Sequence, residues 1–197
     1  MKRLLIATKN KGKVQDFRHL FDKYDIEILS LLDLEKPIKD VEETGTTFEE
    51  NAILKAETIA KSLSMPVLAD DSGLEIDYLD GRPGVYSARY AGLDKNDKDN
   101  LHKVLTELKD VPDESRSARF VCVLAVARPG AETITKRGTC EGTITHQPIG
   151  ENGFGYDPIF QPIKMEKTMA ELSASEKNTI SHRGNALKKL ESWVKEQ

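Results

Sequence analysis

Val67-Leu68-Ala69-Asp70-Asp71-Ser72-Gly73 is the most informative stretch of this sequence, because a short apolar run meets two adjacent carboxylates, a hydroxyl and a glycine. The pattern predicts a buried strand that ends in a turn, and turns expose the residues they carry. Two carboxylates at one strand end repel each other unless a positive charge lies beside them. Mg²⁺ suits that place, since proteins usually hold it with one or two carboxylates and substrate phosphates. A solvated acidic turn is the alternative that this stretch alone leaves open.

The composition predicts one soluble globular domain over residues 1–197, with 38% hydrophobic and 31% charged residues. No apolar run approaches the ~18 residues of a membrane span, and Met1–Thr8 is too short an apolar segment for a signal peptide. Cys122 and Cys140 show neither metal nor redox spacing, which favours buried thiols in a cytosolic protein. We therefore expect a cytoplasmic protein without a membrane partner.

The net charge of −4, with lysine and arginine dispersed among acidic residues, argues against a general nucleic-acid binder. If the protein binds phosphates, its positive charge must be focused in one cleft.

The order of predicted elements favours an α/β fold. A capping box at residues 47–50 starts a helix that Met65-Pro66 ends, and Pro129-Gly130-Ala131 joins two long strands as a hairpin. Early strands alternate with helices around this hairpin, so we expect a central mixed β-sheet flanked by helices, with a cleft between two lobes as the natural site. The other helices are expected at residues 11–22, 96–109 and about 175–195, and strands at 2–8, 25–32, 74–79, 116–128, 132–146 and from 158.

The segment Thr8-Lys9-Asn10-Lys11-Gly12-Lys13 lies where the first strand passes into a helix. Backbone amides at a helix start attract anions, and Lys13 would add a full charge. The segment lacks the first glycine and the Lys-Ser/Thr pair of a Walker A loop. An ordinary polar turn with surface lysines remains the alternative.

An acidic loop with Asp40, Glu42 and Glu43 could supply a second metal ligand beside Asp71, or it could be merely solvated. Spacing alone cannot bring distant carboxylates together. Lys55 lies near the edge of the buried face of its helix, so it either reaches into a cleft or is exposed.

Two further segments carry candidate ligand contacts. In Gly153-Phe154-Gly155-Tyr156-Asp157-Pro158, aromatic rings between glycines suit a stacked nucleobase, and Asp157 could accept hydrogen bonds; a turn whose aromatics cap the core is the alternative. In Ser181-His182-Arg183-Gly184, with Lys177 upstream, the adjacent His and Arg can serve one ligand only near a helix start or bend. A surface helix with basic residues is the alternative there.

These segments together resemble the inosine triphosphate pyrophosphatase family, also called Ham1-like, and in particular its bacterial members. The matching stretches follow the family's order along nearly the whole chain and are more specific together than any one alone. They are Ala7–Asn10, Glu42–Gly45, Thr47–Ala52, Leu68–Leu74, Gly84–Tyr90, Gly153–Pro158 and Ser181–Gly184.

The resemblance implies an elongated two-lobed Maf/Ham1-like fold and an Mg²⁺-dependent diphosphatase, usually a homodimer. It would cut deaminated purine nucleoside triphosphates (ITP, dITP, XTP) to the monophosphate and pyrophosphate and so cleanse the nucleotide pool. Glu42 and Asp71 would hold Mg²⁺, although the sequence does not decide between Glu42 and Glu43, and Asp71 would also accept a proton from water. The residues implied to contact the substrate are Thr8, Lys9, Asn10, Lys11, Gly12, Lys13, Lys55, Ser72, Phe154, Gly155, Tyr156, Asp157, Lys177, His182 and Arg183.

Two other functions stay open at this point. One is a Maf-like pyrophosphatase that acts on modified pyrimidine nucleotides, and the other is a nucleotide-binding module without catalysis. A substrate panel and the Asp71→Asn variant distinguish them.

Overall fold

The computed structural model describes residues 3–21, 24 and 26–195. Residues 2, 22 and 25, at the ends of three predicted elements, lie outside this part. Within it, one six-stranded sheet has the order β2-β1-β3-β4-β5-β6, with β1 parallel to β2 and β3, and β5 antiparallel to β6. The predicted mixed α/β fold is therefore confirmed. The strands are β1 (Arg3–Ile6), β2 (Glu27–Ser30), β3 (Val67–Ile76), β4 (Ser117–Ala127), β5 (Ile134–Ile144) and β6 (Phe160–Pro162), and the α-helices are α1 (Lys11–Phe21), α2 (Phe48–Leu63), α3 (Asp97–Glu107), α4 (Ala174–Ile180) and α5 (His182–Lys195).

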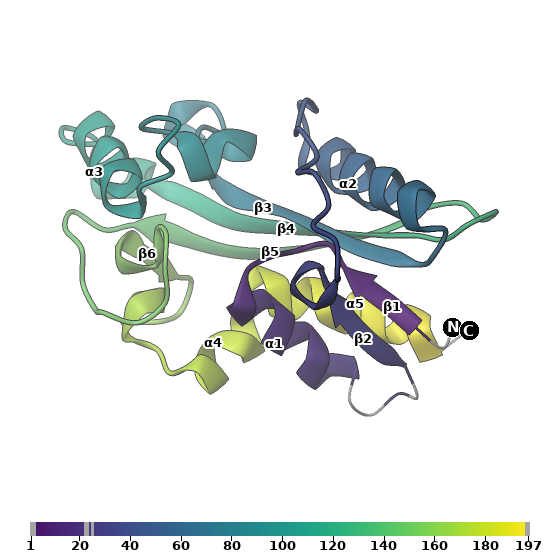
Figure 1. The fold of residues 1–197 in the computed structure, drawn as a ribbon. Helices are drawn as coiled ribbons and strands as arrows, with labels where there is room; N and C mark the ends of the chain where they lie inside the picture. Colours follow the sequence, from purple (N-terminus) through teal and green to yellow (C-terminus); the bar gives the residue numbers. More distant parts are fainter. Residues whose placement is uncertain (1–2, 22–23, 25, 196–197) are drawn as a thin grey trace. The chain divides into compact units, whose positions relative to one another are not determined.

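The chain divides into two compact units. Unit 1 comprises Met1–Asp71, Val123–Arg137 and Ala186–Gln197, and unit 2 comprises Ser72–Cys122 and Gly138–Asn185. In unit 1, α2 lies on one side of the strands, and α1 and α5 lie on the other (Figure 1). The predicted capping box of α2 is present, with the Thr47 side chain accepting from the Glu50 amide. The apolar face predicted for this helix is buried: Phe48, Ala52, Ala56, Ile59 and Ala60.

Unit 2 packs α3 and the loops around β5 and β6 over a core of its own. The Asn96 side chain caps α3 by accepting from the Lys98 and Asp99 amides, and Leu101 and Val104 point into the core. Phe120 and Phe160 pack with their ring centroids 4.4 Å apart. The core of unit 2 therefore extends from α3 to the strand that follows the glycine-rich loop.

The predicted turn after Ala69 and the separate strand over residues 74–79 are both wrong. β3 continues without interruption from Val67 to Ile76, and residues 77–79 form a 3-10 turn. Asp70 and Asp71 thus lie inside a buried strand, 4% and 7% exposed. A strand tolerates buried carboxylates only where cations or hydrogen bonds compensate them, and neighbouring lysines do so here.

The single helix predicted over about 175–195 is in fact two helices. The backbone at Ser181 is extended (φ −65°, ψ 155°), and the Ser181 hydroxyl accepts the Gly184 amide N–H at 3.1 Å to start α5. Gly184 has no room for a side chain, because a Cβ would lie 2.0 Å from the Asn178 carbonyl oxygen. The break places His182 and Arg183 in the first turn of α5, where neighbouring residues can face one ligand.

Among the described residues, every helix is too short or too polar to cross a membrane.

Candidate functional site

Two lysines compensate the carboxylates in the middle of β3. Lys13 Nζ lies 2.5 Å from Asp70 Oδ2, and the Asp70 side chain is only 3% exposed. Lys55 Nζ donates to the Asp70 backbone oxygen at 2.6 Å. The strand, α1 and α2 therefore contribute to one charged cluster within unit 1, which we call the β3 cluster: Lys13, Glu43, Lys55, Asp70 and Asp71.

The acidity of Asp71 is altered in this cluster. Its pKa is raised from 3.8 to about 6: burial is the largest cause, the Glu43 and Asp70 charges also raise it, and Lys55 and the Asn51 amide lower it. A carboxyl with a pKa near 6 is largely ionised at neutral pH, yet it can still accept a proton. The β3 cluster thus contains a group suited to general-base chemistry.

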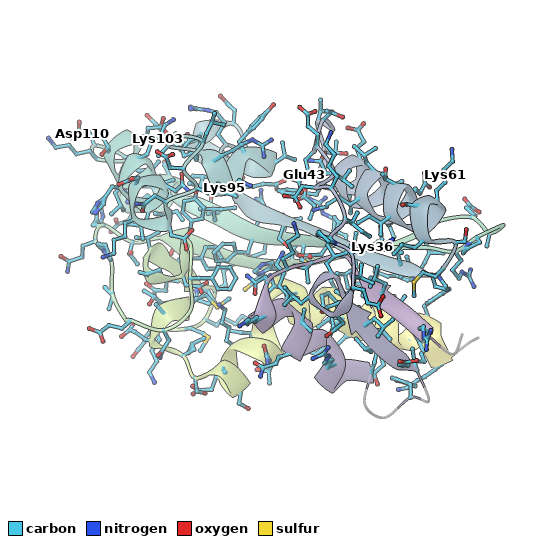
Figure 2. The ribbon with its side chains drawn as sticks, viewed as in Figure 1. Lys36, Glu43, Lys61, Lys95, Lys103 and Asp110 are labelled. Carbon is cyan, nitrogen blue, oxygen red and sulfur yellow. The ribbon has the colours of Figure 1, made fainter. Side chains whose placement is uncertain are left out.

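Glu43, rather than Glu42, joins the β3 cluster. Glu43 lies on the loop before α2 (Figure 2), and its Oε1 is 2.5 Å from Lys55 Nζ, whereas Glu42 is exposed. Burial lowers the pKa of Lys55, but the charges of Asp70, Asp71 and Glu43 outweigh it and raise the pKa overall. Lys55 therefore stays protonated, and Lys61, one turn and a half further along α2, points into solvent (Figure 2).

The turn between β1 and α1 forms as the sequence predicts. Asn10 Oδ1 accepts the Lys13 amide at 3.1 Å, and the Asn10 amide donates to Thr8 Oγ1 at 3.2 Å. Lys9 is ion-paired with Asp40 at 2.6 Å, and Lys11 is exposed. Gly12 belongs to α1, and Ser72 follows Asp71 within β3. An anion at this turn would meet backbone amides and lysines together.

A second group of candidates, the base-loop cluster, lies in unit 2 and consists of Phe154, Gly155, Asp157, Lys177 and Arg183. Asp157 is buried, accepts the Phe154 amide at 2.9 Å and forms an ion pair with Lys177 of α4. Lys177 Nζ and Arg183 Cζ lie 5.0 and 6.0 Å from the centroid of the Phe154 ring. The ring itself is 53% exposed, so one aromatic surface flanked by two cations is open to a ligand.

Tyr156 and His182 are less accessible than the sequence suggested. Tyr156 belongs to the core of unit 2, and its hydroxyl donates to the Ser87 backbone oxygen at 2.7 Å. His182 and Arg183 are each 8% exposed, and His182 stacks on Phe120 at 4.9 Å between ring centroids, whereas Arg183 faces the Phe154 ring. Tyr156 thus anchors the loop, as the alternative interpretation of this segment expected, while Phe154 presents the exposed ring.

Sequence reasoning missed Asn51 and Asp97. Asn51 is fully buried beside Asp71, and its Oδ1 accepts the Gly45 amide at 2.8 Å. A polar residue next to Phe48 and Ala52 on an apolar helix face was the available signal. Asp97 accepts the Gly155 amide at 2.9 Å, a contact that no local pattern reveals.

The donor set of the β3 cluster fits a hard cation. Its oxygen ligands are carboxylates, which Mg²⁺ prefers, and histidine and cysteine are absent from its five members. Within the described part of the chain, no group of three or more acidic, histidine or cysteine side chains forms a complete metal cage. That is compatible with Mg²⁺, which usually keeps waters and substrate phosphates among its ligands.

The site thus combines a mixed α/β fold with a carboxylate pair on one buried strand and lysines from two neighbouring helices. The Ham1 family profile matches residues 4–193, and the chain belongs to this family. It is 60% identical to the dITP/XTP pyrophosphatase of Oceanobacillus iheyensis over 98% of both chains, and 58% identical to that of Halalkalibacterium halodurans over 98% and 100%.

Solved structures agree with this assignment. The Staphylococcus aureus Ham1 protein superposes with a TM-score of 0.92 at 49% identity, covering 98% of both chains. A HAM1 protein from Coxiella burnetii gives a TM-score of 0.93 at 42% identity over the whole of both chains. The family resemblance seen in the sequence motifs is therefore confirmed.

Proposed function

We propose that this protein hydrolyses dITP, ITP and XTP to the nucleoside monophosphate and pyrophosphate, and thereby cleanses the nucleotide pool. The observation that carries the proposal is the β3 cluster, where Lys13 and Lys55 surround a buried carboxylate pair. Relatives up to 60% identical are named dITP/XTP pyrophosphatase, which supports the same substrate class. The comparisons give no support to a pyrimidine-specific enzyme.

Charge explains how the β3 cluster would act. A triphosphate repels an attacking hydroxide, and Lys13 and Lys55 offset that repulsion. Asp71, with a pKa of about 6, orients water and accepts its proton at the carboxylate oxygen. We propose that Asp71 and Glu43 hold Mg²⁺, which when bound would neutralise phosphate charge and stabilise the pyrophosphate leaving group. Glu43 replaces Glu42 in this role because it approaches Lys55 and Asp71.

The base-loop cluster would select the purine. The exposed Phe154 ring offers a stacking surface, since every base has a flat face. Arg183, within the first turn of α5, is a hydrogen-bond donor, and the 6-oxo group of hypoxanthine or xanthine is an acceptor. Adenine presents an amino group at that position, so a donor would be left unpaired against it. Guanine must be excluded at its 2-amino group.

A substrate panel tests the proposal. The purified protein is incubated with Mg²⁺ and ITP, dITP, XTP, ATP, GTP or dUTP, and phosphate is measured with and without added inorganic pyrophosphatase. We expect signal from ITP, dITP and XTP that depends on the added pyrophosphatase, and at least ~100-fold lower kcat/KM for ATP. Direct release of orthophosphate, a pyrimidine preference, or binding of ITP without turnover would each overturn the proposal.

Two lysines of α2 supply a matched pair of variants. Lys55→Ala removes a cation from the β3 cluster and should lower kcat/KM at least ~100-fold, because that charge opposes phosphate repulsion directly. Lys61→Ala removes an exposed cation from the same helix and should stay within about twofold of the unmodified protein. Equal activity of the two variants would contradict the assigned role of Lys55.

We further infer a cytoplasmic location and a homodimer. Cys122 and Cys140 are both buried and form no disulfide with each other, which suits a reducing compartment. Light scattering coupled to size-exclusion chromatography tests the dimer, since a mass near twice that of the chain is expected.

A further inference from the structure

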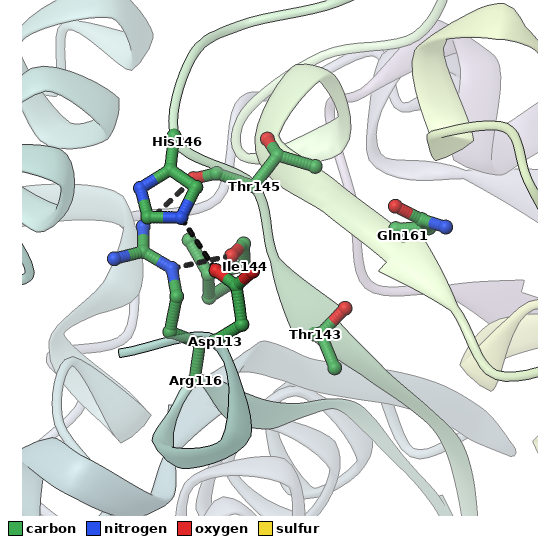
Figure 3. A pocket seen from close by; sticks show the side chains of 7 residues that line it. All are labelled: Asp113, Arg116, Thr143, Ile144, Thr145, His146 and Gln161. Carbon is green, nitrogen blue, oxygen red and sulfur yellow. Dashed lines mark hydrogen bonds and ion pairs between the residues drawn. The ribbon is translucent and has the colours of Figure 1, made fainter. Parts of the chain in front are cut away.

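Helix α3 is attached to the neck of the loop over residues 145–157 through Arg116. This arginine is 2% exposed, and its guanidinium donates to the carbonyl oxygens of Leu108, Val111, Ile144 and Thr145 at 2.6 to 3.3 Å. Figure 3 shows the bonds to Ile144 and Thr145, at the point where β5 ends and the loop begins. The loop therefore leaves β5 from a fixed point.

The same loop is closed on itself close to this point. The Thr145 amide donates to the Ile159 oxygen at 2.9 Å, and the Ile149 amide donates to the Pro158 oxygen at 2.8 Å. Backbone pairing of this kind holds both ends of the loop together. Residues 150–157, which include Phe154 and Gly155 at the tip, extend beyond this pairing.

A hydrogen bond joins the tip to the start of α3. The Asp97 carboxylate, in the first turn of the helix, accepts the Gly155 amide N–H at 2.9 Å. Gly155 has φ +61°, a conformation in which a glycine is favoured, and it directly follows Phe154. The tip of the loop is thus bonded to the N-terminal end of α3, and the neck is joined through Arg116 to Leu108 and Val111, directly after the C-terminal end of the helix.

The pocket beside the neck of the loop is a less suitable ligand site than the exposed Phe154 ring. It has a volume of about 330 Å³ and is lined by Asp113, Arg116, Thr143, Ile144, Thr145, His146 and Gln161 (Figure 3). Arg116 directs its donors at backbone carbonyls, and His146 Nε2 lies 2.5 Å from Asp113. The Arg116 guanidinium therefore binds backbone carbonyls, and His146 pairs with Asp113, rather than either binding an anion.

We propose that Asp97 is a positioning residue, which holds the Phe154 ring in the orientation that receives the purine base. The inference rests on the proposed function, in which Phe154 stacks on the base. Asp97 acts through the Gly155 amide and does not itself touch the substrate. When its carboxylate is removed, the tip of the loop samples more orientations, and base binding must then restrict them.

This role predicts a specific kinetic signature. The base lies far from the bond that breaks, so a contact to it contributes equally to the ground state and the transition state. Asp97→Ala should therefore raise KM for dITP about three- to tenfold, the range that corresponds to one hydrogen bond, with kcat changed less than about twofold. Asp97→Asn keeps an acceptor oxygen and should restore most of the affinity.

Asp99 provides the matched control. It is also an exposed carboxylate in the first turn of α3, so Asp99→Ala removes the same charge from the helix start without removing the Gly155 contact. Hydrogen–deuterium exchange of the segment 150–158 supplies a readout that does not depend on turnover. We expect faster exchange there in Asp97→Ala, and exchange like that of the unmodified protein in Asp99→Ala.

Phe154→Ala, measured in parallel, tests separately whether Phe154 binds the base and whether Asp97 positions Phe154. If it leaves KM unchanged, the loop does not bind the base and the positioning role is overturned with it. If Phe154→Ala raises KM but Asp97→Ala behaves like Asp99→Ala in KM and in exchange, the base site stands and the role of Asp97 is overturned. Raised KM together with faster exchange, in Asp97→Ala alone, supports the proposal.

Discussion

Asp71→Asn should make the protein more stable at neutral pH while it removes the proposed base. The substitution replaces a buried carboxylate by an uncharged group of nearly the same shape. Burial and the repulsion of Glu43 and Asp70, against the attraction of Lys55, together raise the pKa of Asp71 from 3.8 to about 6. The folded chain therefore holds the Asp71 proton more tightly than the unfolded chain does.

The sign of the effect follows from that difference. The ionised Asp71 carboxylate destabilises the fold fully above about pH 6, and this destabilisation disappears as the pH falls toward 3.8. A separation of about two pH units corresponds to roughly 3 kcal/mol of unfolding free energy. We expect Asp71→Asn to gain up to about 3 kcal/mol at pH 8, about half of that near pH 5, and only about 0.5 kcal/mol at pH 4.

Urea denaturation between pH 4 and pH 8, in the presence of EDTA, measures this directly. Asp77→Asn is the control of opposite sign, because a hydrogen bond from Ser117 and the nearby Arg119 lower the pKa of Asp77. At pH 8, Asp77→Asn should be less stable than the unmodified protein, and this difference should shrink as the pH falls through the acidic range. An Asp71→Asn variant no more stable at pH 8, or one whose advantage grows toward pH 4, would refute the reasoning.

Three further outcomes are expected. At limiting Mg²⁺, Glu43→Gln should lower kcat at least about tenfold more than Glu42→Gln does, because Glu43 approaches Asp71. If Mg²⁺ titrations show the larger loss for Glu42→Gln, Glu42 is the metal ligand instead. Arg116→Met should lower the unfolding free energy in urea by roughly 3 kcal/mol, because three buried carbonyls and the partly buried carbonyl of Thr145 lose a donor. Arg119→Met, at a partly exposed ion-pair network, should cost less than about 1 kcal/mol, and similar losses in the two variants would contradict the anchoring role of Arg116. EDTA should abolish pyrophosphate release from dITP and added Mg²⁺ should restore it, while full activity in EDTA would exclude the proposed metal role.

Local patterns predicted most elements because each pattern has a local cause. The capping box at Thr47 and Glu50 starts α2 through bonds between residues three apart, and the apolar spacing behind it defines the buried face. The hairpin between β4 and β5 likewise follows from a turn sequence between two apolar strands. Such features can be predicted from the sequence because each depends on residues that are neighbours in the chain.

The wrong boundary of β3 had its cause far away in the chain, whereas the break at Ser181 depends on nearby residues. Asp70 and Asp71 suggested the end of a strand, but Lys13 and Lys55 compensate them and let β3 continue to Ile76. The break at Ser181 depends on the close approach of Gly184 to Asn178. Compensation of carboxylates by lysines of other elements has no local signature.

The sequence by itself determined the family, the α/β class and the types of residue available for phosphate and base contacts. The tertiary structure alone decided that Glu43 rather than Glu42 approaches Asp71, and that Phe154 is exposed while Tyr156 is buried. The physical reason is that residue type fixes what a side chain can bond. Its pKa, exposure and partners depend on which distant segments the fold brings within a few ångströms.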